Sequence, residues 1–420
     1  MNAPCAYALG LDFGTSNSTV GWWQGQSEPL IPLEDQHLTL PSVIFFNSEE
    51  RRPAYGRQAL NEYLDGYEGR LMRSLKSLLG SKLLKSETTV LGSALPFTEL
   101  LGLFLSQLKT RAEQHTQQSF EHVVLGRPVF FVDDDPLADQ DASATLEQVA
   151  RKIGFKEVSF QYEPIAAAFD YERTITREER VLIVDIGGGT SDFSVVRLSP
   201  QRRGLSDRHD DILATGGVHI GGTDFDKQLN LETVMPLFGY GSRMKSDAFM
   251  PTHYHLNLAT WHTINVLYAQ KTQLALKNMR YDSVDPTGID RLLALIEQRA
   301  GHWLSMQVEA GKIALSSQAS FCLDLARIEQ GLVTELERSR FDGCIAPLLE
   351  RIQQRVLNVV SASLLSAEDI DTLFFTGGSS SVGALRHAIQ QLFPNAQVRD
   401  GNTFGSIGVG LAIEAQRRYA

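Results

Sequence analysis

Short apolar runs bounded by glycine, serine and threonine recur along the chain. Runs of four to eight residues rich in branched and aromatic side chains, with turn residues on either side, predict buried strands. The first such region predicts a pair of strands over 7–23. The same pattern predicts further strands at 43–46, 122–126, 158–161, 181–198 and 374–376.

Between these runs the apolar positions follow the period of a helix. Leu101, Phe104, Leu105 and Leu108 share one face of a helix that we expect from Thr98, as its N-cap, to about Gln114. A polar segment at 200–210 predicts an exposed loop, and the glycines of 216–222 predict a turn before a helix. Further helices are predicted at about 57–85, 142–153, 165–169, 223–310 (mostly helical), 382–393 and from about 404 onward. Strand clusters that alternate with helices predict an α/β fold with layers in both halves.

One pattern occurs twice, about 170 residues apart. In each copy an apolar strand ends in Asp-x-Gly and is followed by a turn of small residues and a second apolar strand. The first copy has Asp12, then Gly14, Thr15, Ser16 and Asn17; the second has Asp185, then Gly187, Gly188, Gly189 and Thr190. A single copy is more often only a turn. Two copies, one opening each half, predict an internal duplication with a ligand between the halves.

The chemistry of these two turns predicts what the ligand is. Tips rich in Gly, Ser and Thr let backbone N–H groups converge on an anion, here those of Thr15 and Ser16 and those of 188–190. An aspartate just before such a tip would repel the anion unless a cation lay between them. We therefore expect a polyphosphate with Mg²⁺, held by Asp12 and Asp185 through water; the alternative for each aspartate is a simple turn cap.

Composition limits the classes of partner. The chain has 420 residues, enough for two large domains, and a net charge of −11. This charge disfavours nucleic acid and anionic membrane as partners. Cys5, Cys322 and Cys344 are far apart in sequence and are expected to be reduced thiols of a cytoplasmic protein. We expect no signal peptide and no membrane span, because no apolar run is long enough.

Four segments resemble the nucleotide-binding half of the seventy-kilodalton heat-shock chaperones, the DnaK family. They are 11–17, 162–168, 184–192 and 375–379. The resemblance implies the actin-like ATPase (ribonuclease H-like) fold, an α/β fold of two duplicated lobes with a nucleotide cleft between them. The chain looks most like the short YegD-like branch, through 125–128, 160–164 and 312–317. Since the sequence ends at Ala420, we expect an ATPase without the peptide-binding domain of the full chaperones.

The resemblance also implies how each lobe is divided. Lobe I is expected over 1–176 and lobe II over 177–403, each with a core and an inserted subdomain, and 404–420 is expected to form a C-terminal helix that packs back on lobe I. The expected segments are a core at about 1–30 and 115–176 with an insert at about 31–114, and a core at about 177–222 and 310–403 with a helical insert at about 223–309.

The resemblance implies four catalytic residues. Lys76 matches the family lysine that reaches the γ-phosphate and the attacking water; the alternative is a solvated helix lysine. Glu163 matches the family glutamate that can act as general base; the alternative, compatible with it, is an acidic residue favoured by a helix N-terminus. Asp192 would share the task of Glu163, and Thr190 would bond the water or the γ-phosphate.

The nucleoside contacts are expected from a helix and two glycine turns. Glu309, Lys312 and Ser316 share one helix face by their spacing, and the resemblance implies that they bond the ribose and adenine; the alternative is an exposed ion pair. Backbone approach to the nucleotide is expected at Gly221, Gly222, Gly377, Gly378 and Ser379. The chain departs from the family at Ile313 and Ser381, where arginines usually stack on adenine, and at Thr223 and Asn402, which replace acidic residues. These departures weaken the expected nucleoside contacts more than the phosphate contacts.

Together the patterns predict a protein that binds ATP or ADP with Mg²⁺. The first hypothesis is a slow ATP-hydrolysing, chaperone-like protein whose lobes open and close with the nucleotide and which acts on a client or regulatory protein. The alternatives are a non-catalytic nucleotide sensor or scaffold and a sugar-type kinase on the same fold. A P-loop enzyme is not expected, because the sequence has no Gly-x-x-x-x-Gly-Lys-Ser/Thr motif.

Overall fold

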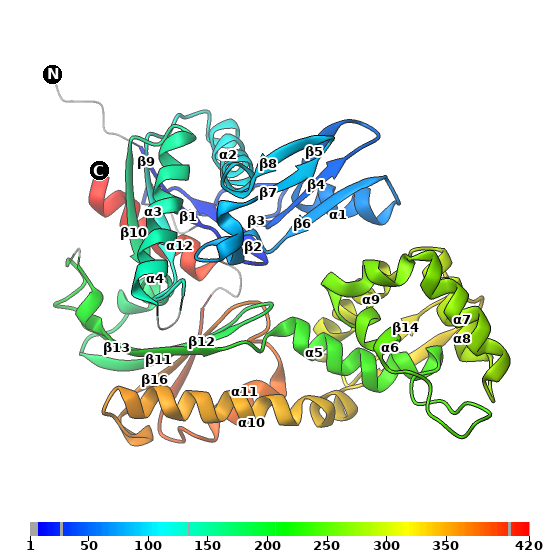
Figure 1. The fold of residues 1–420 in the computed structure, drawn as a ribbon. Coiled ribbons are helices and arrows are strands. Elements are labelled where there is room, and N and C mark those ends of the chain that lie inside the picture. Colours follow the sequence, from blue (N-terminus) through cyan, green and yellow to red (C-terminus); the bar gives the residue numbers. More distant parts are fainter. Residues whose placement is uncertain (1–6, 26–27, 133–134, 206, 402–404, 420) are drawn as a thin grey trace. The chain divides into compact units, whose positions relative to one another are not determined.

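The computed structural model describes residues 7–25, 28–132, 135–205, 207–401 and 405–419. The chain folds into two compact units (Figure 1). The first unit contains Met1–Val218, Arg355–Ser380 and Gln390–Ala420, and the second contains His219–Gln354 and Ser381–Ile389. The first unit includes core segments that the sequence assigned to both lobes, so the lobe boundaries stay a prediction.

Two five-stranded sheets form the framework of the first unit, and they have the same topology. The first sheet has the order β10-β9-β1-β2-β3, and the second has the order β13-β12-β11-β16-β17. In each sheet the opening strand pairs antiparallel with the next strand along the chain and parallel with a strand that comes much later. The predicted α/β duplication is therefore confirmed, with β1 equivalent to β11.

The strand bounds follow the apolar runs closely. The first sheet consists of β1 (Ala8–Asp12), β2 (Asn17–Gly21), β3 (Thr39–Pro41), β9 (His122–Arg127) and β10 (Glu157–Tyr162). The second consists of β11 (Glu179–Ile186), β12 (Ser191–Leu198), β13 (Ile212–Val218), β16 (Thr372–Thr376) and β17 (Gln397–Asp400). The central strands are almost continuously apolar because both of their faces are buried.

Two helices complete the core of the first unit. They are α4 (Glu163–Glu172) and α12 (Ser406–Tyr419), and α12 packs against α4, β1 and β9. Residues 165–169 of α4 form one apolar cluster with Leu411 and Ala415 of α12 and with strand residues of both sheets, such as Val124 and Ile183. The helices approach closely because Gly410 has no side chain: a Cβ there would lie 1.9 Å from the carbonyl oxygen of Ala166.

We expect Gly410→Ala to destabilise the first unit. The added methyl group cannot fit against backbone, so α12 must shift, and overpacking of this kind costs roughly 1–3 kcal/mol. The measurement is urea unfolding. The control is Gly343→Ala in the helix α10 (Arg338–Ala362), where a Cβ meets nothing within 4 Å. That change should stabilise its helix by roughly 0.5–1 kcal/mol; equal effects from the two substitutions would contradict this account of α12.

The remaining elements of the first unit lie mostly between β3 and β9. A small sheet has the order β5-β4-β6, and β7 pairs with β8. The elements are β4 (Val43–Asn47), β5 (Arg52–Tyr55), α1 (Gly56–Leu64), β6 (Gly69–Arg73), β7 (Glu87–Val90), β8 (Ser93–Pro96), α2 (Phe97–Thr116) and α3 (Pro136–Lys152), with 3₁₀ turns at Leu75–Leu78, Lys82–Lys85, His209–Asp211 and Ala367–Asp369.

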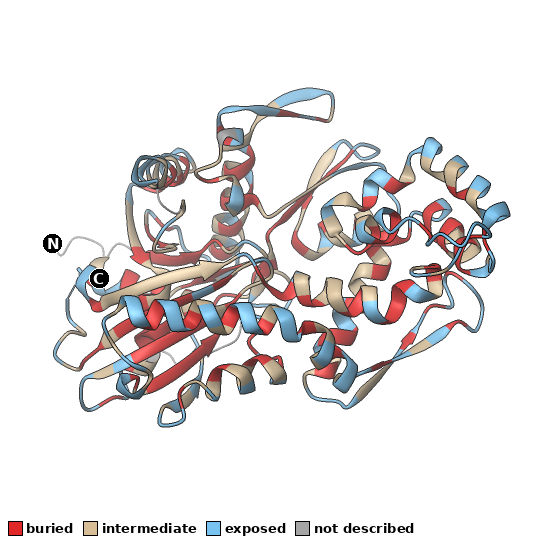
Figure 2. Ribbon diagram, turned by 60° about the horizontal axis from the view of Figure 1, so that its bottom comes forward, coloured by how far each residue is buried: buried red, intermediate tan, exposed pale blue. Residues whose placement is uncertain are grey.

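The second unit is mostly helical, as predicted. Its helices and strands are α5 (Gly222–Leu229), α6 (His253–Leu258), α7 (Gln270–Asp282), α8 (Thr287–Glu297), α9 (Gly301–Leu315), β14 (Ser320–Asp324), β15 (Val333–Glu337) and α11 (Gly383–Gln390), with irregular turns at Asn230–Val234, Met235–Phe238 and Trp261–Tyr268. The long helix α10 belongs to both units. Buried residues recur along it at helical spacing, at Ile345, Leu349, Ile352 and Val356 (Figure 2).

Several local predictions were wrong. The expected helix over 57–85 ends at Leu64, and the chain then forms β6, which pairs with β4. That strand was missed because its pairing partner lies more than 20 residues earlier in the sequence. Thr98 is not an N-cap, since α2 begins at Phe97 after Pro96, although the four predicted apolar residues of α2 are all buried.

Two predicted loops also differ from the structure. The segment 200–210 is not wholly exposed, because Arg208 within it is buried. Gly216 and Gly217 lie in β13 rather than in a turn.

Asn402 and the predicted helix start at Phe404 lie outside the described residues. Within the described residues, no helix is both long and apolar enough to cross a membrane.

Candidate functional site

The two predicted phosphate hairpins meet in the first unit. The first tip joins β1 to β2 and the second joins β11 to β12. A Cβ built at Gly188 of the second tip would lie 2.3 Å from the Oγ atom of Ser16 in the first. The tips therefore touch, with Gly188 packed against the side chain of Ser16. The first tip is braced by Ser42, whose Oγ donates to the carbonyl of Gly14 at 2.7 Å and whose N–H donates to that of Ser16 at 2.8 Å.

The second tip is closed by its own hydrogen bonds. The N–H of Gly187 donates to the carbonyl of Thr190 at 2.9 Å, and Thr190 Oγ1 donates to Asp192 Oδ2 at 3.0 Å. Asp185 pairs with Asp192 across the hairpin. The hairpin thus brings two of the predicted site carboxylates to the same end of the second sheet.

A third loop packs at the same end. It contains Gly377, Gly378 and Ser379 and follows β16, the parallel neighbour of β11. Gly377 has φ +84, and a Cβ there would lie 2.3 Å from Asp185 Oδ1. The N–H of Ser379 donates to the carbonyl of Ile186 at 3.0 Å. A left-handed glycine is needed here, because a side chain would both strain the backbone and collide with Asp185.

Lys76 and Glu163 form an ion pair with 2.6 Å between Nζ and Oε1. Lys76 lies in the 3₁₀ turn Leu75–Leu78, and Glu163 is the first residue of α4, directly after β10. Only 13% of the lysine side chain and 14% of the glutamate side chain are exposed. The alternative of a solvated helix lysine is therefore wrong for Lys76. Glu163 is the first residue of α4, so the interpretation as an acidic residue at a helix N-terminus is confirmed. It is also paired with Lys76.

The carboxylates of this cluster act on one another. Burial, and then the charge of Glu163, raise the pKa of Asp12 to about 7, against a smaller opposite effect of Lys76. Although Asp185 is only partly buried, desolvation of its carboxyl and the charges of Asp192, Glu163 and Asp12 raise its pKa to about 8. Burial lowers the pKa of Lys76, but Glu163 and Asp12 outweigh it, so that the pKa is raised and the lysine is charged.

These pKa values show that the cluster has too little positive charge for its carboxylates. The charges of Glu163, Asp12 and Asp192 all act on the Lys76 ammonium, and an additional cation would favour the ionised forms of Asp12 and Asp185. Carboxylate oxygens suit Mg²⁺. In the described part of the chain, no three His, Cys, Asp or Glu side chains are grouped so that they could hold an ion by themselves. The carboxylates of Asp12 and Asp185 are ligands of the kind that fit Mg²⁺, held directly or through its waters.

Several of the predicted nucleoside residues lie in the second unit, among them Lys312 and Gly222. Lys312 of α9 is buried; its Nζ donates to Asp226 Oδ2 at 3.0 Å and to the carbonyl of Gly222 at 3.2 Å. The alternative of an exposed ion pair on the face of α9 is wrong for Lys312, because this lysine is buried and pairs with Asp226 of α5. Burial raises the pKa of Asp226 to about 6, opposed by Lys312. Glu309 is exposed, and Ser316 is the C-cap of α9.

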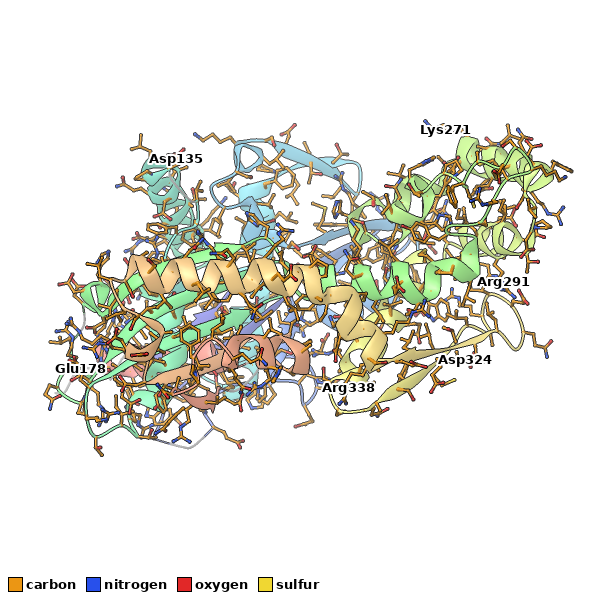
Figure 3. All side chains as sticks on the ribbon, turned by 90° about the horizontal axis from the view of Figure 1, so that it is seen from below. Asp135, Glu178, Lys271, Arg291, Asp324 and Arg338 are labelled. Atoms are coloured by element: carbon orange, nitrogen blue, oxygen red, sulfur yellow. The ribbon has the colours of Figure 1, made fainter. Side chains whose placement is uncertain are left out.

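Neighbouring contacts fix this group. Arg338, labelled in Figure 3, donates from Nε to the carbonyl of Leu315 at 2.8 Å and so holds the last turn of α9. Gly221, the N-cap of α5, donates its N–H to Asp224 at 2.9 Å. Ile313 is 63% exposed, and Ser381 and Thr223 are also exposed. Ile313 and Ser381 stand where the resemblance implied guanidinium groups, and Thr223 stands where it implied an acidic residue.

Sequence reasoning missed two residues of these sites. One is Ser42, which braces the first hairpin; the serine directly after Pro41 was the available signal. The other is Asp226, the partner of Lys312. A buried lysine almost always has an acidic partner, but the sequence alone did not indicate that Lys312 would be buried. The catalytic, nucleotide-binding and metal roles of the predicted residues stay predictions.

Comparison with known proteins identifies the family. The family model described as Hsp70 protein matches residues 8–240 and 286–417. Among curated relatives, the chaperone protein DnaK of Ureaplasma urealyticum serovar 10 is 24% identical over 97% of this chain and 58% of its own length. That of Thermosipho africanus is 25% identical over 97% of this chain and 58% of its own length. That of Thermosipho melanesiensis is 24% identical over 99% of this chain and 60% of its own length.

The chain thus spans about three fifths of the length of the curated relatives it matches. The match includes both duplicated hairpins, Lys76 and Glu163. The two equivalent mixed sheets agree with the architecture expected from it. The YegD-like branch stays a prediction. The chain belongs to the Hsp70 family and has the two-lobed α/β architecture of an actin-like ATPase.

Proposed function

We propose that this chain binds ATP with Mg²⁺ and hydrolyses it slowly to ADP and phosphate, as the nucleotide-driven part of a chaperone-like protein. The observation that supports the proposal is the Lys76–Glu163 ion pair beside Asp12 and Asp185. Phosphoryl transfer requires positioned groups and compensation of charge more than covalent chemistry by the protein. This cluster supplies a charged ammonium, a carboxylate base and two carboxylates suited to a cation.

Each residue has a distinct part in the proposed reaction. Lys76 would bond the γ-phosphate and orient the attacking water, and Glu163 would accept the proton of that water. Thr190 would hold the water or a γ-phosphate oxygen, with its hydroxyl oriented by Asp192. The N–H groups at the two hairpin tips would bind phosphate oxygens. Bound Mg²⁺ would supply positive charge at the phosphates, with Asp12 and Asp185 accepting hydrogen bonds from its waters.

The nucleotide state would be transmitted to a protein partner. The curated relatives are named chaperones. We therefore propose that this chain acts on a protein client or regulator, and that opening and closing of its lobes with the nucleotide controls this interaction. We propose the cytoplasm as the compartment, since it holds ATP and Mg²⁺ and since Cys322 and Cys344 are free thiols.

A non-catalytic nucleotide sensor is the second candidate, favoured by the exposed Ile313 and Ser381 in the second unit. Without arginines at these positions the base would lose cation–π stacking of about 0.5–2 kcal/mol per face. Weaker binding of the base would leave phosphate recognition as the main source of affinity. A sensor needs only that recognition, without turnover.

One assay separates the candidates. Purified protein is incubated with ATP, with and without Mg²⁺, and both phosphate release and thermal unfolding are followed. We expect slow, Mg²⁺-dependent release, and stabilisation by about 2.7 kcal/mol when ATP is at 100 times its dissociation constant. Stabilisation without release would favour the sensor. Formation of ADP that requires an added sugar, without release of phosphate, would favour a kinase, because a kinase transfers the γ-phosphate to the sugar. If ATP does not stabilise the protein and no phosphate is released, the proposal is wrong.

A further inference from the structure

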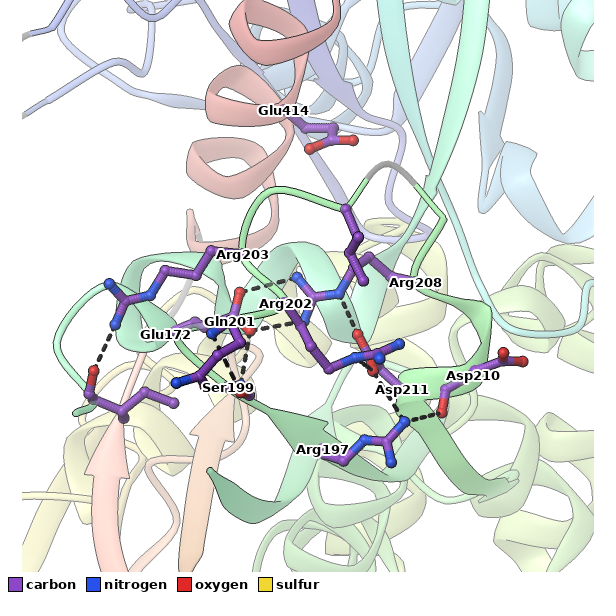
Figure 4. Close-up of polar contacts among 12 residues, drawn as sticks. Glu172, Arg197, Ser199, Gln201, Arg202, Arg203, Arg208, Asp210, Asp211 and Glu414 are labelled. Atoms are coloured by element: carbon purple, nitrogen blue, oxygen red, sulfur yellow. Dashed lines mark hydrogen bonds and ion pairs between the residues drawn. The ribbon is translucent and has the colours of Figure 1, made fainter. Parts of the chain in front are cut away.

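A fully buried arginine outside the candidate site anchors one of its helices. Arg208 is the largest of the side chains that are almost wholly inaccessible to solvent in the described part of the chain. Its guanidinium donates to both carboxylate oxygens of Glu172, at 2.7 and 3.0 Å, and from Nε to Asp211 (Figure 4). The Glu172 and Asp211 side chains are 1% and 0% exposed. We call Glu172, Arg208 and Asp211 the Arg208 clamp.

The clamp lies at the opposite end of α4 from the site. Glu163 is the first residue of α4 and Glu172 is the last. With a rise of 1.5 Å per residue, the two are about 13 Å apart along a rigid helix. Glu172 also accepts the N–H of Ser199 at 3.1 Å, just after β12 ends at Leu198. The same helix thus carries the candidate base at one end and a two-pronged ionic contact at the other.

The partner segment begins at the strand that carries Asp192. This segment, described at 199–205 and 207–211, follows β12, whose second residue is Asp192. It is fastened at further points. Arg202 bonds Asp211 (Figure 4). Arg203 donates to the carbonyl of Ile175 at 2.5 Å, and Arg417 of α12 donates to the carbonyl of Leu205 at 2.8 Å. The clamp therefore ties the end of α4 to a segment continuous with the second site hairpin.

Stability alone does not explain the charges of the clamp. Removing two carboxylates and a guanidinium from water is costly, and apolar residues of similar volume often stabilise a core as well or better. The apolar cluster of residues 165–169 with the strands of both sheets already holds α4 in place. What a bidentate arginine adds is directional geometry, because its planar fork accepts the carboxylate in one orientation.

We propose that Arg208 is a positioning residue for ATP hydrolysis: by holding Glu172 at the C-terminal end of α4, it sets the place of the Glu163 carboxylate relative to Asp192 and Lys76. The inference rests on the proposed function. Arg208 touches no reacting group, so its effect on the reaction passes through α4. A displacement of about 1 Å at a reacting group can lower a rate about a hundredfold.

The test measures kcat and KM for MgATP, and separately the affinity for MgADP, in the full chain. The first variant is Arg208→Met combined with Glu172→Leu, which removes both charges of the pair and keeps an apolar filling. The second is Arg208→Lys, which keeps the charge but cannot make the two-pronged contact. The control is Arg52→Met with Glu62→Leu: Arg52 and Glu62 form an ion pair of the same length, 2.7 Å, between β5 and α1, in which the arginine side chain is 40% exposed.

We expect the double variant to lower kcat about 10- to 100-fold, with MgADP affinity and KM changed less than about twofold. Arg208→Lys should give an intermediate kcat, and the control pair should leave kcat unchanged. A merely structural role predicts instead that kcat and MgADP affinity fall together with the folded fraction, and this outcome would overturn the inference. The inference would also be overturned if kcat of Arg208→Lys lay within about twofold of the parental value. This second measurement tests the inference even if the double variant does not fold.

Failure of the inference can be told apart from failure of the proposed function. If the parent protein releases no phosphate from MgATP, the proposed function fails and the positioning role fails with it. If the parent is active and the Arg208 variants are equally active, only the inference fails. Supporting results are a fall in kcat at constant MgADP affinity and its partial recovery with lysine.

Discussion

Replacing Lys76 by alanine is expected to lower phosphate release from MgATP by about 10²–10³-fold while leaving ATP binding measurable. The Lys76 ammonium lies 2.6 Å from Glu163 and its side chain is 13% exposed. A buried charged group that is aimed at the site of charge development acts mainly on the transition state, because water does not screen it. Its loss should therefore reduce kcat far more than it reduces affinity.

The loss of Lys76 has a second consequence. Lys76 is the cation that lowers the pKa of Asp12 and Asp185 against the effect of burial. Without it Asp12 and Asp185 will hold their protons to higher pH, so any residual activity should need more alkaline conditions. The pH profile of the variant is the measurement, and an unchanged profile would contradict the electrostatic role given to the lysine.

Lys109 provides a matched control for Lys76. It forms an ion pair with Glu113 at 2.5 Å within α2, and its side chain is also 13% exposed. Lys109→Ala removes an equally buried charge from the same unit without touching the site cluster. Phosphate release should stay at the parental rate in this variant. Equal losses in the two variants would mean that Lys76 contributes to stability and not to the reaction.

The parts of the fold that the sequence predicted are those with a local signal. Both Asp-x-Gly hairpins could be located because each apolar strand and its turn lie within a short window. The helix face of α2, with Leu101, Phe104 and Leu108, follows from spacing alone. The duplication followed from comparing two such windows. None of these predictions required knowledge of which distant segments meet.

The parts that no local pattern predicted depend on contacts between distant residues. Lys76 and Glu163 are 87 positions apart, and only a family resemblance suggested that they share a site. Arg208 lies in a polar segment that looks solvated, and it is buried because Glu172, 36 positions earlier, neutralises it. The strand β6 was assigned to a helix because its pairing with β4 leaves no periodic signal. Burial of a charged residue is decided by its partner, which no local pattern names.

Replacing Asp185 by asparagine is expected to stabilise the metal-free protein at high pH and, at the same time, to weaken its binding of Mg²⁺. Burial and neighbouring carboxylates raise the pKa of Asp185 to about 8 in the folded protein, against 3.8 as the ordinary value. The metal-free folded state therefore binds more protons than the unfolded state between about pH 4 and pH 8. Its stability is complete below the ordinary pKa and falls as the pH rises through about 8. Asparagine carries no charge, so the variant should escape that part of the fall.

The expected difference in stability between the variant and the parent follows from this fall in the stability of the parent at high pH. At pH 9 and without metal, Asp185→Asn should be more stable than the parent, on the order of 1–3 kcal/mol, and at pH 4 the difference should be small. Urea unfolding at the two pH values measures it. A variant that is less stable than the parent at pH 9 would show that the carboxylate of Asp185 is not strained by its surroundings.

The same substitution is expected to lower the affinity for Mg²⁺ in the presence of nucleotide by about 10–100-fold, because Asp185 is proposed to hold the waters of the ion. In the parent, Asp12 and Asp185 must lose protons when the cation binds, since their pKa values are about 7 and about 8. Mg²⁺ affinity should therefore increase as the pH rises toward 8, with protons released. Calorimetry in two buffers of different ionisation enthalpy measures this release, which Asp185→Asn should reduce.

The control for this measurement is Asp369→Asn. Asp369 is an exposed carboxylate whose pKa is lowered by Ser366, and its replacement should leave proton release unchanged. If Asp185→Asn binds Mg²⁺ like the parent, the metal lies elsewhere and the assignment of the two hairpin aspartates is wrong.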